Sequence, residues 1–417
     1  MNTKYPFDVY QIRRDFPILF KKIDGHSLVY FDSAATTQKP RQIIETLRRF
    51  YLEEYGTVHR SIYPLSMQAT EQYHHVRFLI KRLINAREEE EIVFTHGTTE
   101  GINLLASSLG KTCLNQGDEV LISIAEHHAN FVPWQLLCQE KKCILKVAPI
   151  NHQGELMIQE FSRLLSPKTK IVSLAHVTNV TGAIYPIKQI TEMAHQVGAK
   201  VIIDGAQAAS HLPVDVQDLD VDFYLFSGHK LYAPTGVGVL YGKKELLNSL
   251  PPFMTGSDMI EHVSLNKTTF QASPLRFEAG TPPFAQVIAL GAAVKYIESI
   301  GLAAIADWEH HLLLYTKEKL RAMDEVHLIG DGNYAQGGII SLTIDQCHPL
   351  DVGTLLGTRG ISVRTGHLCA QPLLQFFNQE ALIRISFGLY NTYEEIDMLV
   401  DTLKEIISMI HHDTLKV

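Results

Sequence analysis

Short apolar segments alternate with longer segments of helical periodicity through the middle of the chain. The segments with strand character are residues 91–95, 119–124, 144–148, 170–175, 200–204, 222–227 and 236–241. Helical patterns lie between them at 100–109, 133–139 and 187–197. Apolar strands separated by helices predict an α/β fold, in which a mostly parallel seven-stranded sheet is flanked by helices.

The pattern changes after about residue 290. A helical stretch at 286–300 leads to a second helix and then to the strand-like segments GGIISLTI, ISVRTG and LIRISF. A strongly amphipathic helix follows a Thr392-x-x-Glu395 capping box. We therefore predict a large domain over residues 26–295 and a smaller α+β domain over 296–417, with residues 1–25 packing against the small domain.

Composition excludes several classes of protein. The chain has 37 Lys and Arg against 45 Asp and Glu, a net charge of −8, and no basic tract that predicts a nucleic-acid partner. The first residues lack the apolar core of a signal peptide, and no apolar run reaches the ~18 residues of a membrane span. The 5 cysteines are too scattered for a disulfide framework, and Cys138 and Cys143 lack a second pair for zinc. We expect a cytoplasmic protein without a metal.

Lys230 is the most informative residue of the sequence. It follows an apolar strand within FSGHKLYAPTGVGVLY, residues 226–241. Most lysines are solvated surface residues, but open α/β sheets bind ligands at the carboxyl ends of their strands. A lysine desolvated at such a place has a lowered pKa and acts as a nucleophile towards aldehydes.

Two further features lie at strand ends. Asp204 ends the strand in KVIIDGAQA, where a carboxylate suits a metal ion, a helix N-terminus or a pyridinium nitrogen. A lysine with an acidic partner for the ring nitrogen is the recurrent requirement of pyridoxal phosphate enzymes. After the strand 91–95, HGTTE opens a helix whose N–H groups and hydroxyls can bind a phosphate, although a plain helix cap is the alternative.

With these residues, the chain resembles the cysteine desulfurases of the pyridoxal phosphate fold type I superfamily, in the Suf-type group close to selenocysteine lyases. The matching segments are YFDSAATTQKP (30–40), YGTVHRSIYPLS (55–66), THGTTEGIN (95–103), EHHANFVPW (126–134), HVTNVTGAIYP (176–186), IDGAQA, FSGHKLYAPTG, RFEAGTPP (276–283) and RTGHLCAQP (364–372). The resemblance covers nearly the whole chain. It implies the fold type I architecture and pyridoxal 5′-phosphate as the cofactor.

The resemblance also implies which residues hold the cofactor. Lys230 would form a Schiff base with it and move protons at the substrate Cα. Asp204 would pair with the ring nitrogen, Gln207 would bond the phenolate oxygen, and His127 would stack on the ring and assist proton transfer. The remaining implied contacts are Asn179 to cofactor and substrate, Thr98, Thr99, Ser227 and His229 to the phosphate, and Thr281 to the phosphate of the other subunit in a homodimer.

The implied substrate site lies near the C-terminus of the chain. Arg384, an arginine in the apolar strand LIRISF, would bind the substrate carboxylate in a bidentate pair. Arg364 and His59 would line the same pocket. Cys369, in the loop RTGHLCAQP, would attack the substrate sulfur and keep it as a persulfide. The chain departs from many relatives at Ala233, where glycine is common, and at Leu368, where Suf-type relatives often have histidine.

The implied reaction converts L-cysteine to L-alanine and supplies sulfur for iron–sulfur cluster assembly. Because the loop from Gly366 to Pro372 is short and contains proline, we expect Cys369 to stay in the cleft and a small acceptor protein of the SufE or SufU kind to collect its sulfur. The nearest alternative is a selenocysteine lyase acting on L-selenocysteine. An inactive scaffold that binds persulfide partners is a third, but the joint presence of the catalytic residues argues against it.

Overall fold

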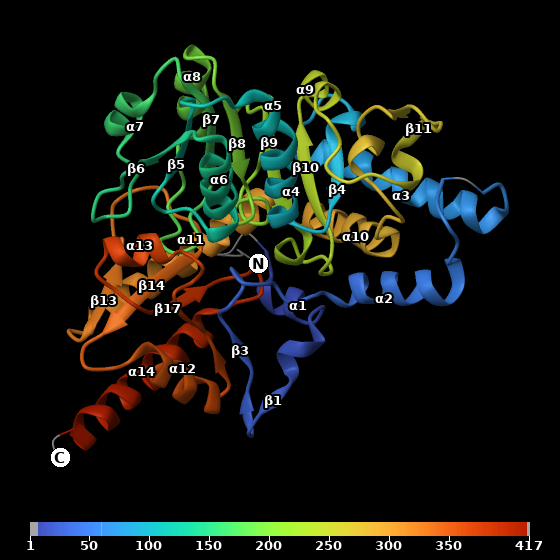
Figure 1. The fold of residues 1–417 in the computed structure, drawn as a ribbon. Coiled ribbons are helices and arrows are strands. Elements are labelled where there is room, and N and C mark those ends of the chain that lie inside the picture. The colour runs from blue at the N-terminus through green and yellow to red at the C-terminus, as the bar shows by residue number, and fades with distance from the viewer. Residues whose placement is uncertain (1–6, 60, 415–417) are drawn as a thin grey trace.

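The structure, a computed structural model, describes residues 7–59 and 61–414 (Figure 1). A seven-stranded sheet with the strand order β4-β10-β9-β8-β7-β5-β6 forms its centre. The strands are β4 (Ile92–Thr95), β5 (Glu119–Ser123), β6 (Ile144–Ala148), β7 (Thr169–Ala175), β8 (Lys200–Asp204), β9 (Phe223–Ser227) and β10 (Gly238–Gly242). The neighbours from β6 to β9 pair in parallel, and β10 runs antiparallel to β9 and β4. The predicted, mostly parallel seven-stranded sheet is confirmed.

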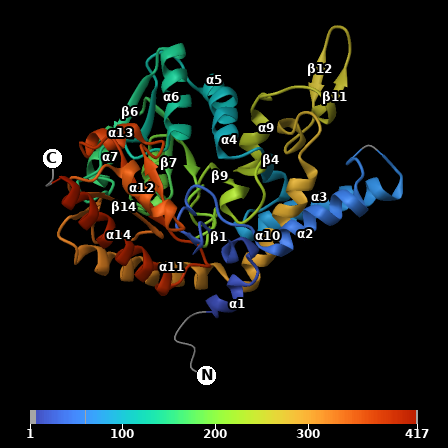
Figure 2. The same ribbon diagram turned by 90° about the horizontal axis from the view of Figure 1, so that it is seen from below.

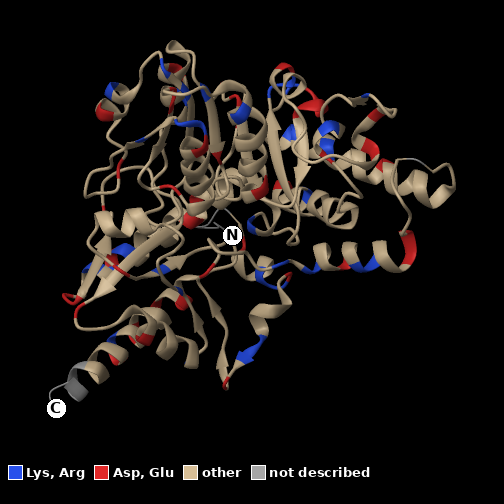
Figure 3. Cartoon of the chain, in the orientation of Figure 1, with Lys and Arg blue, Asp and Glu red and all other residues tan. Residues whose placement is uncertain are grey.

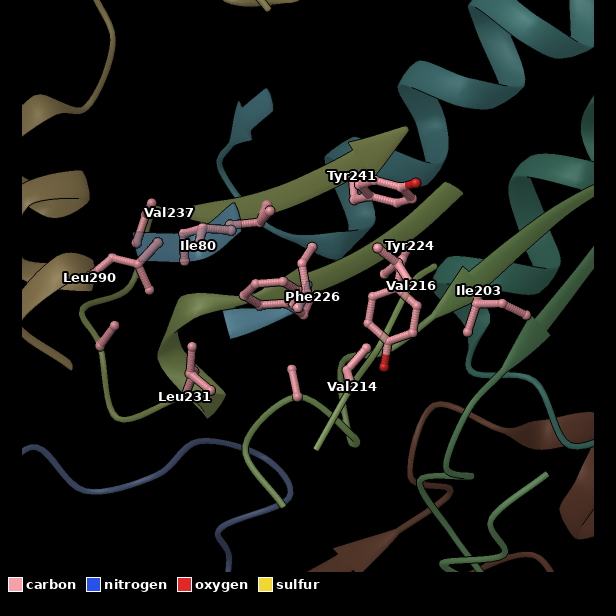
Figure 4. Close-up of a cluster of buried hydrophobic side chains, with 14 of the residues drawn as sticks. Ile80, Ile203, Val214, Val216, Tyr224, Phe226, Leu231, Val237, Tyr241 and Leu290 are labelled. Atoms are coloured by element: carbon pink, nitrogen blue, oxygen red, sulfur yellow. The ribbon is translucent and has the colours of Figure 1, made fainter. Parts of the chain in front are cut away.

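Helices cover both faces of this sheet because its strands carry apolar side chains on both faces. Along β9, Phe223 and Leu225 belong to one buried cluster, whereas Tyr224 and Phe226 belong to another. The first cluster packs against α4 (Thr98–Leu105) and α6 (His128–Lys141), and the second packs against α3 (Pro64–Leu83), α8 (Ile187–Gln196) and α10 (Phe284–Ile300). Figure 4 shows part of the second cluster, with Ile80 and Leu290 against the strand residues Tyr224 and Phe226.

The helices differ from the predicted ranges mainly at their ends. The predicted helix at 100–109 is α4 followed by a π-helical turn, η4 (Ala106–Gly110). The helix expected from residue 133 begins at His128 instead, because His127 caps it and Pro133 is accommodated inside it. The shorter elements around the sheet are α2 (Arg41–Arg49), η2 (Phe50–Glu54), α5 (Lys111–Cys113), α7 (Ile158–Leu164), α9 (Lys244–Ser249) and the projecting hairpin of β11 (Ile260–Val263) and β12 (Thr268–Phe270), which is clearest in Figure 2.

A second, antiparallel sheet lies towards the C-terminus, in the order β13-β14-β17-β16. Its strands are β13 (Val326–Ile329), β14 (Ile339–Ile344), β16 (Arg364–Gly366) and β17 (Leu382–Ser386). The helices of this part are α11 (Leu302–Arg321), α12 (Pro349–Thr358), α13 (Gln371–Phe376) and α14 (Tyr393–Thr414). The predicted capping box is confirmed at the start of α14, where the backbone N of Thr392 donates to Glu395 and the N of Glu395 donates to the Thr392 hydroxyl.

The N-terminal segment contacts the C-terminal part of the chain. Arg13, at the end of α1 (Val9–Arg13), forms an ion pair of 2.8 Å with Glu395. The strand β3 (Val29–Tyr30) pairs in parallel with β15 (Ile361–Ser362). Before β3, the strands β1 (Lys22–Ile23) and β2 (His26–Ser27) pair with each other as a small hairpin. The division at residues 25 and 295 stays a prediction, and residues 1–6 lie outside the described part.

Acidic and basic residues are interspersed along the described part of the chain (Figure 3). No single helix in the described ranges is both long and apolar enough to cross a membrane, although α10 and α11 would meet that test together as a pair bent by 73°.

Candidate active site

A cavity of about 450 Å³ lies where the carboxyl ends of β7, β8 and β9 meet the C-terminal sheet. Ala175, Asp204 and Ser227 line it from the central sheet, and Arg364 and Arg384 line it from β16 and β17. Strand ends of two sheets therefore face one space. The residues predicted for the site that line this cavity are Thr98, Thr99, His127, Asn179, Asp204, Gln207, Ser227, His229, Lys230, Arg364, Cys369 and Arg384.

Two predicted site residues lie elsewhere in the chain. His59 lies between η2 and α3, with its ring 5.5 Å from that of Tyr73 and 5.4 Å from that of His74. Thr281 is exposed in the turn before α10. Neither lines the cavity of the single chain, so their roles in the site stay predictions.

Lys230 and Asp204 come from neighbouring parallel strands, which explains why they share the cavity. Lys230 follows β9 in a short 3-10 turn, and Asp204 is the last residue of β8. Burial lowers the pKa of Lys230 to about 8, although the charge of Asp204 opposes this shift. Burial raises the pKa of Asp204, and the N–H of Ala206, 2.9 Å away, partly offsets that rise. The site thus holds an amine that is partly neutral near pH 8 beside a carboxyl group.

A small polar cradle forms where α4 begins. The backbone N of Thr98, in the first turn of α4, donates to the Ser227 hydroxyl at 2.9 Å, and the two hydroxyls lie 2.8 Å apart. A Cβ added to Gly238 would lie 2.5 Å from the Cα of Gly97, so this close approach of β10 requires glycine. Burial lowers the pKa of His229 to about 4, so its ring is neutral near pH 7. The helix N-terminus and these hydroxyls suit a phosphate.

His127 is held by its own helix. Its Nδ1 accepts a 3.1 Å hydrogen bond from the backbone N of Ala129, as an N-cap of α6. Burial lowers the pKa of His127 to about 3, and the charge of Lys230 adds to the shift. The ring is therefore neutral near pH 7, and Nε2 carries its proton. The helix start is further fixed by Glu126, which is fully buried and accepts hydrogen bonds from Ser123 and Asn130.

Three buried polar atoms of cavity-lining residues have no partner among the described residues: Asn179 Oδ1, Gln207 Oε1 and Arg384 Nε. The amide nitrogens of the first two are occupied, by the carbonyls of Leu368 and Ala34 at 2.7 Å each. Buried polar atoms normally find partners, so these atoms indicate a polar ligand. An amine, a carboxyl group, a buried amide and a phosphate cradle around one cavity match the parts of pyridoxal phosphate.

The far end of the cavity is basic and suits a carboxylate. Arg384 is buried, and its Nη1 donates to the backbone carbonyl of Asn179 at 3.0 Å. Asp32 lies between the two arginines, with oxygens 3.4 Å from Arg384 Nη2 and 4.0 Å from Arg364 Nη1. Two positive charges with one negative charge leave one net positive charge, which matches one substrate carboxylate.

Cys369 belongs to a loop that is tied down on both sides. Leu368 and Cys369 both have a left-handed backbone, with φ of 53° and 55°, which is unusual for a bulky residue such as leucine. The backbone N of Cys369 donates to His367 Nδ1 at 3.0 Å, and its carbonyl accepts from the N of His128 at 2.7 Å. Cys369 lines the cavity and is exposed in the single chain. Cys369 therefore lies at the cavity and is open to solvent in the single chain.

The two departures noted in the sequence fit the structure. The side chain of Leu368 is buried, and its backbone carbonyl accepts the hydrogen bond from Asn179. Ala233 is fully buried, and its N donates to the Gly228 carbonyl at 3.0 Å.

Comparisons with known proteins agree with this geometry. Residues 29–399 match the aminotransferase class-V family. A cysteine desulfurase of Escherichia coli strain K12 is 47% identical over 401 residues, which are 96% of this chain and 98% of the relative. The chain belongs to the cysteine desulfurases of this pyridoxal-phosphate-dependent family. A cysteine desulfurase of Synechococcus elongatus is 46% identical over 96% of this chain, which spans 64% of that relative's length.

Solved structures of cysteine desulfurases have the same fold. The S-sulfonic acid form of the cysteine desulfurase CsdA from Escherichia coli has a TM-score of 0.89 at 36% identity, with 97% of this chain and 99% of that chain covered. The apo cysteine desulfurase of Thermococcus onnurineus has a TM-score of 0.91 at 34% identity, covering 96% and 98%. The predicted fold class and the cysteine desulfurase family are confirmed, and the Suf-type group stays a prediction.

Several residues that shape this cysteine desulfurase site were not predicted. Asp32 contacts both arginines, and His128 stacks on His367 beside the cysteine loop with ring centroids 5.7 Å apart. Asp32 lies in the quoted segment YFDSAATTQKP, and His128 lies in EHHANFVPW. The matching segments marked these stretches, but no spacing rule connects residue 32 with residue 384. Among the described residues, no group of three or more His, Cys, Asp or Glu is arranged to hold a metal ion.

Proposed function

We propose that the protein converts L-cysteine to L-alanine and holds the released sulfur as a persulfide on Cys369. The observation that carries this proposal is the shared cavity of Cys369, Lys230, Asp204 and Arg384. A lysine and an aspartate supply the groups that a pyridoxal enzyme needs. The thiol adds a nucleophile, and the buried arginine adds a site for an amino acid carboxylate.

The cofactor would be held by the strand-end residues of the central sheet. Lys230 would bind its aldehyde carbon, Asp204 its ring nitrogen and Gln207 its phenolic oxygen. The phosphate would lie in the cradle of Thr98, Thr99, Ser227 and His229, and in a homodimer Thr281 and His59 would reach the site of the second copy. When bound, pyridoxal phosphate withdraws electrons from the substrate carbons next to its amino group.

The chain's own residues would bind and orient the substrate. Arg384 would take the carboxylate in a charge-assisted pair, with Arg364 and Asn179 nearby. Lys230, once free as an amine, would remove the Cα proton, because a pKa of about 8 leaves part of it neutral near pH 7. His127 stays uncharged at that pH and can lie against the ring.

Cys369 would then take the sulfur. Its sulfur attacks the substrate sulfur, so that an S–S bond forms as the Cβ–S bond breaks. The electron pair of the broken bond stays on Cβ, which receives a proton and becomes the methyl group of alanine. One cysteine thiol and one enzyme thiol thus give alanine and one enzyme persulfide, without any other oxidant or reductant.

We also propose the assembly and the partner. Large exposed apolar side chains lie along α2, η2 and the start of α3, which a second copy would cover in a homodimer; they are Ile44, Tyr51, Leu52, Tyr55, Tyr63, Leu65 and Met67. The carbonyls of Leu368 and Cys369 accept hydrogen bonds from Asn179 and from the backbone N of His128, so the loop would not carry the persulfide far. A small acceptor protein of the SufE or SufU kind would come to it in the cytoplasm and pass the sulfur to iron–sulfur cluster assembly.

The deciding experiment is alanine production from L-cysteine by the holoenzyme. A fast first turnover followed by a slow rate, and a higher steady rate with an acceptor thiol, is expected because the persulfide blocks the next cycle until a thiolate attacks it. A linear full rate without acceptor or reductant would refute storage on Cys369. No alanine at all would refute the reaction.

A further inference from the structure

The backbone carbonyl of His229, the residue before Lys230, accepts hydrogen bonds from four groups of one N-terminal segment. The donors are the backbone N of Thr37 and the hydroxyls of Thr36 and Thr37, each at 3.1 Å, and Lys39 Nζ at 2.7 Å. A carbonyl oxygen has two lone pairs, so four donors exceed what is needed to satisfy it. The peptide between His229 and Lys230 is thereby fixed in orientation.

The same segment also holds the other end of the turn. The backbone N of Tyr232 donates to the Thr37 hydroxyl at 3.0 Å. Tyr232 is fully buried and has a left-handed backbone, with φ of 60°, which a large side chain adopts only when its surroundings hold it there. Thr37 therefore contacts the turn on both sides of Lys230.

Burying the amine of Lys39 carries a desolvation cost that a residue with a purely space-filling role would not have. Besides His229, its Nζ donates to the carbonyl of Thr37 at 2.5 Å and to the Thr37 hydroxyl at 3.3 Å. Burial lowers the pKa of Lys39 to about 7, and no ion pair is made by it within the described ranges. A methionine would fill similar space without the cost of desolvating an amine. What lysine adds at this position is its hydrogen-bond donors to Thr37 and His229.

We propose that Thr37 and Lys39 are positioning residues that fix the His229–Lys230 peptide and so direct the Lys230 side chain to the cofactor. Neither residue lines the cavity, so both act through Lys230. The His229 contacts fix the peptide plane before Lys230, and the bond from Tyr232 N to Thr37 restrains the backbone after it. Together they limit rotation about the Lys230 N–Cα bond and so the direction of its Cα–Cβ bond, from which the reactive nitrogen is four bonds removed. Because a misplacement of about 1 Å can cost about 10²-fold in rate, such control matters for catalysis. The inference rests on the proposed role of Lys230.

The test compares Thr37→Val, which removes the hydroxyl at nearly constant shape, with Thr37→Ser, which keeps it. The first readout is the fraction of Lys230 covalently bound to pyridoxal phosphate, measured by borohydride reduction and peptide mass. The second is the pH midpoint of the cofactor absorbance. Thr37→Val should lower the bound fraction, shift the midpoint and reduce kcat about 10-fold or more. The KM for L-cysteine should change less than about 2-fold, and Thr37→Ser should stay near the wild type.

Lys39→Met is a milder second variant, because it leaves three of the four donors to the His229 carbonyl. Thr46→Val is the control for loss of a threonine hydroxyl, because the Thr46 hydroxyl bonds only within α2. The inference is overturned if Thr37→Val keeps the wild-type linkage and midpoint and only its unfolding temperature falls. If Thr37→Val does not fold, Lys39→Met decides by the same readouts. If borohydride reduction of the wild-type protein placed pyridoxal phosphate on another lysine, the role of Lys230 would be refuted. If the wild-type protein carried the cofactor on Lys230 but made no alanine from L-cysteine, only the proposed reaction would be refuted.

Discussion

The side-chain amide of Asn179 donates a 2.7 Å hydrogen bond to the backbone carbonyl of Leu368, the residue before Cys369. Asn179 follows β7, and its own carbonyl accepts from Arg384 at 3.0 Å. The cysteine loop is thus joined to the central sheet and to the carboxylate site by one residue. A displacement of the loop would therefore be passed through Asn179 to Arg384, the residue proposed to bind the substrate carboxylate.

Asn179→Ala should loosen the cysteine loop. The loss of one buried hydrogen bond, about 1 kcal/mol, should reduce alanine production about 5- to 10-fold and change the alkylation rate of Cys369 by iodoacetamide. Asn151→Ala is a suitable control, because that amide bonds to Glu155 in another loop. Unchanged alkylation and turnover would show that the bond does not restrain the nucleophile.

Lys230→Ala should abolish turnover while the phosphate cradle still retains some cofactor. Removing a residue that both bonds the cofactor and moves protons should lower kcat by at least about 10²–10⁴-fold. Single-turnover alanine production and borohydride trapping measure the two functions. A variant that keeps both a reducible cofactor bond and wild-type alanine production would exclude the assignment.

Cys369→Ser should bind cofactor and substrate but fail to transfer sulfur, because serine matches the shape of cysteine and cannot form a persulfide. Absorbance changes on adding L-cysteine measure binding, and labelling with radioactive sulfur measures the persulfide. Cys347→Ser is a control at a buried cysteine that does not line the cavity. Normal desulfuration by Cys369→Ser would assign the nucleophile elsewhere.

Arg384→Lys should raise the KM for L-cysteine about 10- to 100-fold with a smaller change in kcat. The ammonium keeps the charge but loses the planar fork, and a hydrogen bond to a charged group contributes about 1.5–3 kcal/mol. Steady-state kinetics with Arg364→Lys for comparison should show a weaker effect there, since Arg364 is 53% exposed and Arg384 only 4%. Equal effects at both positions would contradict a dominant role for Arg384.

Capture of pyridoxal phosphate by the cofactor-free protein should depend on pH. The neutral amine is the reactive form of lysine, and the pKa of Lys230 is about 8. The rate of capture should therefore rise as the pH increases through about 8 and level off above it, as stopped-flow absorbance would measure. An ordinary lysine titrates near 10.4, and a rise centred there would contradict a desolvated Lys230.

Part of the cavity lining could be predicted from the sequence, because strand ends can be recognised locally. The apolar segments ending at Asp204 and Ser227 mark two strands, and carboxyl ends of parallel strands meet at one edge. These residues needed no knowledge of distant contacts.

Other parts of the site depend on contacts between distant segments. The pairing of β3 with β15 brings Asp32 towards Arg384, although 352 residues separate them. The contact of Lys39 with His229 likewise spans 190 residues. No periodicity or spacing encodes such pairs, so they were visible only in the folded chain. The antiparallel direction of β10 was also not specified, because an apolar run does not encode strand direction.

Asp204 ends β8 and Lys230 follows the neighbouring strand β9, whereas Cys369 lies in the loop after β16 and Arg384 lies in β17 of the other sheet. The residues proposed to hold the cofactor and those proposed to bind the carboxylate and accept sulfur therefore come from two different sheets. The short loop around Cys369 is not part of the β8–β9 pairing that spaces Asp204 and Lys230, so that spacing does not depend on the loop sequence. An engineered variant could therefore carry a different loop at this position while the spacing of Lys230 and Asp204 stays constant.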